Sequence, residues 1–298
     1  MAQLHRTQEI SLLEEAIAVL FCLVDDAYAS INPKGQRYDS LKRLSDSEVL
    51  ALALFQQLRG VESERSFLRD SQRFFSHLFP GVVGLAPSSF HRRVCKLRRF
   101  LEPLRRTVLP DLVGDPETLI VDSSLLAVVH PRQVSRSAGW GGSSSGAAWV
   151  RWGSFSVYGV KLHLLCATNR VPLSYELTPA NVAQAHLSEE LLYGAELGEG
   201  VARKLLADLA YRSSKLEEAL AECGVRLVTE RADQRGKRQQ VEVALATLKR
   251  EFRLGETLAT TLVGLASRIA AKVTAYTYGL FVNRMMGRPQ GRIKELWA

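Results

Sequence analysis

Three acidic residues have the types, spacing and surroundings of a catalytic metal site. Asp122 follows an apolar run that begins at residue 119, Asp208 ends a second run that begins at residue 204, and Glu242 lies in an amphipathic segment 34 positions further on. Hard divalent cations prefer carboxylate oxygens as ligands. Two Mg²⁺ ions held by three carboxylates can activate a water or a hydroxyl and stabilise the leaving oxygen of a phosphodiester. The pattern predicts this chemistry; the alternative is that each residue is an ordinary surface acid.

The elements that must position these carboxylates can be predicted from residue 114 onward. Alternating and apolar runs predict five strands, and helical spacing predicts three helices. The strands are expected at residues 119–124, 156–168, 171–177, 204–208 and 225–230, and the helices at 181–192, 213–223 and 236–252. This order is typical of an α/β, ribonuclease H-like fold with a mixed five-stranded sheet flanked by helices. The first strand would be central with the fourth beside it, so Asp122 and Asp208 should emerge together, with Glu242 across the same edge.

The segment 132–153, between the first two predicted strands, is rich in Gly, Ser, Trp and Arg. The glycines at positions 139, 141, 142 and 146 offer no side chains with which to bury a core, and they predict a mobile loop. Trp140, Trp149 and Trp152 alternate with arginines there, and such rings can stack on unpaired bases. The alternative is that the tryptophans pack on the protein itself.

The first 113 residues are predicted to be helical. Apolar residues recur at helical spacing over 10–23, and Ser45 with Glu48 forms a capping box before the apolar run 49–58. A last helix is expected at 262–280. We therefore predict an all-α region at 1–113, a sheet domain at 114–285 and a short basic tail at 286–298.

A helix that begins at Pro87 carries an unusual density of basic residues. A short helix, a turn and this basic helix resemble a helix-turn-helix, with Ser89, Arg92, Arg93 and Lys96 able to face a DNA groove. The alternative is a solvated helix face. The basic side chains are those of Arg92, Arg93, Lys96, Arg98, Arg99, Arg105 and Arg106.

Composition restricts the class of protein without identifying it. The 298 residues should form about two domains, and the net charge of +8 favours a polyanionic partner while also fitting an ordinary basic enzyme. Four isolated cysteines, without Cys/His ligand spacing, indicate neither a zinc site nor a disulfide framework and suit a reducing cytosol. The apolar stretch 16–24 is shorter than the ~20 residues of a membrane span, so we expect a cytoplasmic, nucleoid-associated protein with no membrane partner.

Several motifs together resemble bacterial insertion-sequence transposases of the DDE type, closest to the insertion sequence 982 family. The motifs are Asp122 after an apolar strand, Tyr158-Gly-Val-Lys-Leu-His163, Thr178-Pro-Ala-Asn181, Asp208-Leu-Ala-Tyr211, Arg238-x3-Glu242-x6-Lys249, and the helix from Gly264 to Lys272. The resemblance implies a ribonuclease H-like core, Mg²⁺ or Mn²⁺ dependence, cleavage that exposes a 3′-hydroxyl, and strand transfer into target DNA. Two departures concern substrate contacts: Leu209-Ala210 replaces the family's usual Lys-Gly, and Arg235 stands where a tyrosine is common.

The signature helix also makes physical sense as a DNA contact. Arg238 and Glu242 are four residues apart and share a helix face, and Lys249 lies two turns beyond Glu242. Arg238 and Lys249 could hold the DNA backbone, or Arg238 could be a simple ion-pair partner of Glu242 and Lys249 an exposed lysine. On the second strand Lys161 and His163 share one face, so Lys161 could touch phosphate and His163 could neighbour the metals, although a lone strand histidine is usually structural.

The sequence thus predicts a two-domain transposase with Asp122, Asp208 and Glu242 as ligands of two Mg²⁺ or Mn²⁺ ions. Its partners would be the transposon terminal repeats and target DNA, and work at two ends implies at least a homodimer. Two competitors remain open. One is a metal-dependent nuclease that cuts without joining, and the other is a non-catalytic DNA-binding protein derived from a transposase.

Overall fold

The computed structural model describes most of the chain, and its residues form two compact units. One unit comprises Met1–Val108, Glu251–Arg253 and Ile269–Ala298, and the other comprises Leu109–Arg250 and Leu254–Arg268. We refer to them as the helical unit and the sheet unit. The described residues are 2–34, 42–137, 139–141, 146–184, 189–195, 203–229, 235–256 and 258–296.

The helical unit contains only helices and turns among its described residues. Ser45 caps α2 as predicted: its Oγ accepts a hydrogen bond from the Glu48 backbone N–H at 3.0 Å, and the Glu48 carboxylate accepts one from the Ser45 N–H at 2.5 Å. The predicted helix over 10–23 lies inside the longer helix α1. The helices of the helical unit are α1 (Ala2–Ile31), α2 (Asp46–Leu58), α3 (Glu64–Phe74), α4 (Pro87–Leu97), α5 (Leu101–Thr107) and most of α10 (Leu262–Met285), with 3-10 turns at Pro80–Val82, Arg98–Phe100 and Ile293–Leu296.

Most of helix α10 belongs to the helical unit, which differs from the predicted sheet domain of 114–285. From Ile269 onward it packs with the N-terminal helices, where Thr274 and Tyr278 donate side-chain hydrogen bonds to the backbone carbonyls of Leu101 and Leu104. Lys272 is buried and donates to the Glu62 carboxylate at 2.6 Å. Helical spacing predicts the buried stripe of such a helix but not its partner, which explains the difference.

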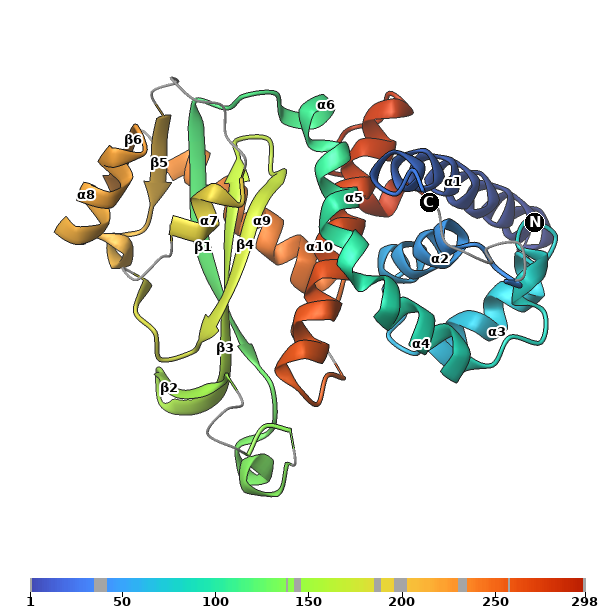
Figure 1. Ribbon diagram of the computed structural model, residues 1–298, viewed down its shortest axis with the longest axis horizontal. Helices are drawn as coiled ribbons and strands as arrows, with labels where there is room; N and C mark the ends of the chain where they lie inside the picture. Colours follow the sequence, from blue (N-terminus) through green and yellow to red (C-terminus); the bar gives the residue numbers. More distant parts are fainter. Residues whose placement is uncertain are drawn as a thin grey trace. The chain divides into compact units, whose positions relative to one another are not determined.

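In the sheet unit, six strands form one mixed sheet (Figure 1). Strand β1 is central with β5 beside it, as predicted for the first and fourth strands. Strand β3 is antiparallel to β1 and β4, and β5 is parallel to β1 and β6. The sixth strand, β2, pairs with the first half of β3 and lies in the segment predicted to be a loop. Gly153, at φ +60°, provides the turn between β2 and β3. The strands are β1 (Thr118–Ala127), β2 (Ala148–Trp152), β3 (Phe155–Ala167), β4 (Pro172–Pro179), β5 (Arg203–Ala207) and β6 (Val225–Thr229).

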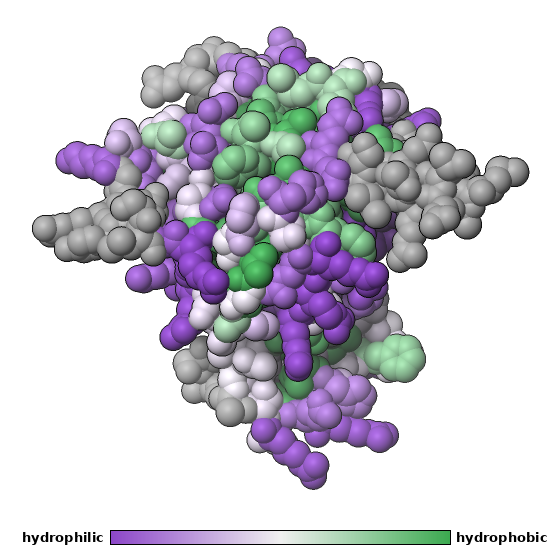
Figure 2. Space-filling view, turned by 90° about the vertical axis from the view of Figure 1, so that its right-hand side faces the viewer, coloured by the Kyte–Doolittle hydropathy of each residue, from purple (hydrophilic) through white to green (hydrophobic). Residues whose placement is uncertain are grey.

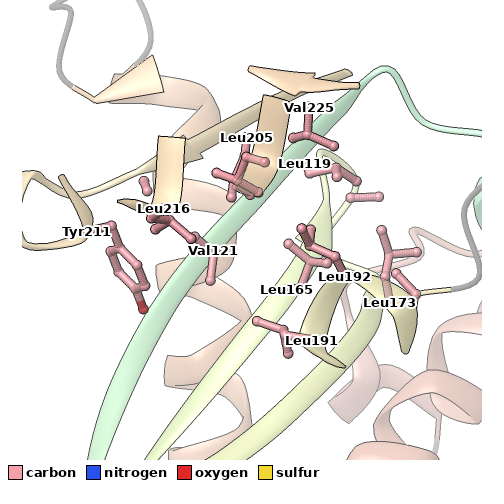
Figure 3. Close-up of a cluster of buried hydrophobic side chains, with 14 residues drawn as sticks. Leu119, Val121, Leu165, Leu173, Leu191, Leu192, Leu205, Tyr211, Leu216 and Val225 are labelled. Atoms are coloured by element: carbon pink, nitrogen blue, oxygen red, sulfur yellow. The ribbon is translucent and has the colours of Figure 1, made fainter. Parts of the chain in front are cut away.

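Helices cover both faces of the sheet. One face buries an apolar cluster that includes Leu119, Val121 and Leu165, together with residues of α7 (Glu189–Tyr193) and α8 (Ser214–Glu222) (Figure 3). Helix α9 (Arg235–Arg250) packs against β1 and β3. Because Leu119 and Val121 occupy the α7/α8 face, alternation along β1 directs Asp122 to the opposite face, which is the α9 face. Short helical segments at Leu109–Val113, Pro131–Arg136 and Leu209–Tyr211 complete the unit.

No helix within the described part of the chain is long and apolar enough to cross a membrane.

Candidate active site

Asp122 and Asp208 lie side by side on neighbouring parallel strands. Asp122 is in the middle of β1, because this strand continues to Ala127 in register with β3. The predicted strand over 119–124 therefore ended three residues too early. Asp208 directly follows β5. The last parallel pair joins Ile120 to Leu206, so two further residues along each chain bring Asp122 level with Asp208 on the same face.

Helix α9 brings Glu242 and Arg238 to this pair of aspartates. The Arg238 guanidinium lies 3.2 Å from a carboxylate oxygen of Glu242, one turn along the helix, and 4.0 Å from a carboxylate oxygen of Asp208. Asp208 and Glu242 are 47% and 44% exposed, and Arg238 is 34% exposed. The four charged groups therefore form one accessible cluster, in which a single cation contacts two of the three acids.

The electrostatics of the cluster place Asp122 at its buried end. Burial raises the pKa of Asp122, and the nearby carboxylates of Glu242 and Asp208 act in the same direction, whereas the Ser123 N–H and the Arg238 guanidinium oppose them. The Ser123 N–H donates to the Asp122 carboxylate at 2.7 Å. Ionised Asp122 thus needs more positive charge than Arg238 supplies, and a bound cation would provide it.

The described residues fit a metal site only in part. No three His, Cys, Asp or Glu side chains within the described ranges lie close enough to hold one metal ion. The Arg238 guanidinium stands beside Asp208 and Glu242. Ser124, on the same face of β1 as Asp122, has a buried hydroxyl with no hydrogen-bond partner among the described residues. A buried hydroxyl without a hydrogen-bond partner, on the same face as carboxylates that repel each other, is what a bound ion or its water ligands would explain. Asp122, Asp208 and Glu242 would hold the metal if the guanidinium of Arg238 moved away from Asp208 and Glu242.

A buried hydrogen-bond network supports the two aspartates from the opposite face of the sheet. His163 contacts the Tyr211 hydroxyl at 3.2 Å and the Thr178 hydroxyl at 3.0 Å through its two ring nitrogens. Tyr211, three residues after Asp208, also hydrogen-bonds to the hydroxyl of Ser123, to which Gln184 donates at 2.7 Å. Figure 3 shows the ring of Tyr211 at one end of the apolar cluster. The network joins the residue after Asp122 to the turn after Asp208.

The network shows what sequence analysis missed around the site. The role of Ser123 can be found from alternation, because the residue after an inward-facing carboxylate must face the other side of the sheet. No sequence pattern predicts the contact of Gln184 with Ser123. Its segment follows β4, and only the folded chain brings it to β1.

Lys161 and His163 do not join the carboxylates. Register pairs His163 with Ser123 and Leu164 with Asp122, so Lys161 and His163 lie on the face opposite Asp122. The Lys161 ammonium donates to the Val182 carbonyl at 2.6 Å, and burial lowers its pKa. The interpretation of His163 as a neighbour of the metals was therefore wrong, because period-two alternation separates it from Asp122. The interpretation of Lys161 as a phosphate contact stays a prediction.

The three tryptophans have different surroundings. Trp140 is 2% exposed and its indole N–H donates to the Ala259 carbonyl at 3.1 Å; the interpretation that it stacks on bases was wrong, because its ring packs on the protein. Trp149 is 46% exposed and contacts the ring of Tyr158. Trp152 is 64% exposed, opposite Phe155, which is 74% exposed, near the β2–β3 turn. Trp149 and Trp152 keep free ring surface.

The basic residues of the helical unit also separate into two kinds. Arg92 and Lys96 are exposed one turn apart on α4. Arg93 instead donates to the Leu44 carbonyl at 2.6 Å and to the Asp46 carboxylate at 2.5 Å. Both bonds hold Arg93 against its own unit, and its role in facing a groove stays a prediction. Figure 2, which views the molecule from the side of these helices, shows hydrophilic side chains projecting between apolar areas.

Further along the predicted basic face, the helix breaks into α4, a 3-10 turn and α5. Arg105 there is fully buried and paired with Glu102. In the sheet unit, Lys249 is exposed near the end of α9, two turns beyond Glu242.

Comparison with known proteins identifies the class to which this fold and site belong. The family model described as "Transposase DDE domain" matches residues 113–278, more than half of the chain. The chain belongs to this family and is a DNA transposase. Domains of this family generally use divalent metal ions.

Two solved structures of transposases are similar to most of the chain. The cryo-EM structure of the piggyBac transposase synaptic complex with hairpin DNA is 12% identical with a TM-score of 0.43, covering 94% of this chain and 79% of that chain. The crystal structure of a pre-cleavage Mos1 transpososome is 9% identical with a TM-score of 0.32, covering 86% and 77%. A search of the curated proteins found no match.

Proposed function

We propose that this transposase cleaves DNA at the ends of an insertion sequence to expose a 3′-hydroxyl and joins that hydroxyl to target DNA. Asp122, Asp208 and Glu242 would bind two Mg²⁺ or Mn²⁺ ions. Bound there, the ions would supply activation of the attacking water or hydroxyl and stabilisation of the leaving oxygen, so no protein nucleophile would be needed. The observation that carries the proposal is the electrostatic coupling of the three carboxylates on one sheet face, around the guanidinium of Arg238.

The remaining parts of the proposal concern partners and origin. The protein would bind the terminal inverted repeats of a bacterial element related to the insertion sequence 982 family, act as at least a homodimer, and work on the nucleoid in the cytoplasm. Arg238 and Lys249 would hold the DNA backbone near the metals, Trp149 and Trp152 would contact unpaired bases, and Arg92 and Lys96 would contact the ends through the helical unit. The motifs around Asp208 and Glu242 support the family assignment.

Cleavage and joining test the proposal directly. Purified full-length protein is incubated with DNA carrying the inverted repeats that flank its reading frame, with Mg²⁺ or with EDTA, and products are separated on gels. Asp208→Asn keeps the side-chain shape but removes a charged ligand, so cleavage and joining should fall by orders of magnitude while DNA binding persists. Asp111→Asn, an exposed residue outside the cluster, serves as the matched control.

The same gels separate the competing functions. Near-normal cleavage by Asp208→Asn would contradict the carboxylate assignment. Cleavage without joined product in the wild-type protein would identify a nuclease, and Mg²⁺-independent binding with no cleavage would identify a non-catalytic DNA-binding protein.

A further inference from the structure

A basic cavity lies in the sheet unit at the edge strand β6. Its volume is about 330 Å³, and its walls are the side chains of Lys204, Arg212 and Glu217 together with residues 226–229 of β6. Strand β6 is the last in the sheet order, which puts the cavity at that edge. None of the roles assigned above uses these residues.

Within the described part of the chain, the positive charges that line this cavity outnumber the negative ones. Lys204, Arg212 and Arg226 supply three positive charges against one negative charge from Glu217. No hydrogen bond or ion pair joins these four side chains to one another or to any other residue that the structure describes. Structural arginines and lysines usually find a carboxylate or a carbonyl, as Arg93 and Lys272 do here. Three cations that share one cavity repel each other, and an anion would relieve that repulsion.

Strand geometry relates the cavity to the carboxylates. Lys204 and Arg226 are register partners on the parallel strands β5 and β6, so they lie on one face of the sheet. Lys204 and Asp208 are four residues apart, and alternation puts them on the same face. At ~3.3 Å per residue, the two Cα atoms are roughly 13 Å apart. A single DNA strand is long enough to pass over both positions.

We infer that this cavity binds phosphate groups of the DNA backbone a short distance along the strand from the phosphodiester that is cleaved at Asp208. Lys204 and Arg226 supply most of the attraction, and Arg212 adds to it. Glu217 weakens the binding and limits how tightly DNA is held. The inference rests on the proposed action of this protein on DNA, but binding at the cavity does not require the carboxylates or a metal ion.

The test measures how DNA binding depends on salt. Full-length protein is titrated into a short fluorescein-labelled duplex, and fluorescence anisotropy gives the association constant at several KCl concentrations. Each lost phosphate contact reduces the slope of log K against log [KCl] by about 0.9. Lys204→Gln with Arg226→Gln should therefore reduce the slope by about 1.8, and each single variant by about half of that. Glu217→Gln should bind the duplex more tightly than wild type.

Lys215→Gln is the matched control, because Lys215 is exposed on α8 but does not line the cavity. Circular dichroism melting of each variant checks that it is folded. An unchanged slope in the double variant, or an equal reduction in Lys215→Gln, would overturn the inference. So would weaker binding by Glu217→Gln.

A second measurement separates DNA from a small anion. If inorganic phosphate raises the melting temperature of wild type but not of the double variant, while the DNA slope is unchanged, the cavity binds free phosphate and the DNA assignment is wrong. Metal-dependent cleavage is assayed in parallel. If the double variant has an unchanged salt slope while the wild-type protein cleaves DNA, the cavity inference is wrong and the proposed function stands. If the double variant has the expected reduction in slope but the wild-type protein does not cleave DNA, only the proposed function is wrong.

Discussion

The guanidinium of Arg238 lies 3.2 Å from the carboxylate of Glu242, which is the third of the three predicted metal ligands. This ion pair spans one turn of α9, and the same guanidinium is 4.0 Å from Asp208. A positive group in this position reduces the repulsion among the three acids and competes with a metal ion for two of them. Arg238 is therefore placed to exchange between the carboxylates and a DNA phosphate.

The competition between Arg238 and the metal can be measured. Arg238→Gln removes the cation beside Asp208 and Glu242, so Mn²⁺ should stabilise this variant at lower concentrations than it stabilises wild type. The midpoint of the Mn²⁺-dependent rise in melting temperature gives the apparent affinity. Lys237→Gln removes the same charge from an adjacent exposed position of α9 and should have a smaller effect. Weaker Mn²⁺ stabilisation in Arg238→Gln would show that Arg238 supports the metal site instead.

Lys249 allows DNA positioning to be separated from metal binding. If its ammonium holds a phosphate beside the metals, Lys249→Ala should impair strand transfer, which needs the transposon end and the target aligned in line. A charged hydrogen bond is worth roughly 1.5–3 kcal/mol, or about ten- to a hundredfold in rate. Cleavage and joining are compared on gels, and Mn²⁺ stabilisation should be unchanged. Wild-type rates in both steps would leave Lys249 as an exposed helix lysine.

The basic residues of α4 should separate by their contacts. Arg92→Gln with Lys96→Gln removes two exposed charges, so the slope of log K against log [KCl] for end binding should fall by about 1.8, with no change in melting temperature. Arg93→Gln should instead lower the melting temperature, because it removes bonds to Leu44 and Asp46. A salt slope that is unaffected by the double change would mean that this helix face is only solvated.

Buried His163 should make stability depend on pH. Burial, with a contribution from the charge of Lys161, lowers the pKa of His163 from 6.5 to about 4. The unfolded chain then binds the proton more readily, so stability is complete above pH 6.5 and is lost as the pH falls toward 4. The loss is on the order of 3 kcal/mol at ~1.4 kcal/mol per pH unit.

Urea unfolding of His163→Gln at several pH values tests this expectation. The variant lacks the titrating group, so its stability should vary less between pH 6.5 and 4, whereas the exposed His130→Gln should behave as wild type. An identical pH dependence in wild type and His163→Gln would mean that other groups cause the acid sensitivity.

Local patterns determined much of the fold. The capping box at Ser45 and Glu48 predicted where α2 begins, because a cap needs only neighbouring residues. The central position of the first predicted strand, with the fourth beside it, was confirmed, since the alternation of strands and helices along the chain restricts the possible sheets to very few. The i,i+4 spacing also anticipated the Arg238–Glu242 pair as one of two interpretations. Strand β2 was not predicted, because it is held in the sheet by pairing with β3 and not by its own composition.

Tertiary structure alone decided which side chains are free to act. Arg92 and Arg93 are adjacent in sequence, but only Arg93 meets the carbonyl of Leu44 and the carboxylate of Asp46. Trp140 and Trp152 occupy the same kind of sequence, yet only Trp140 has a distant carbonyl for its indole N–H. The physical reason is that residue type and periodicity specify the direction of a side chain, while burial and hydrogen bonding depend on segments far away in the chain that fold against it.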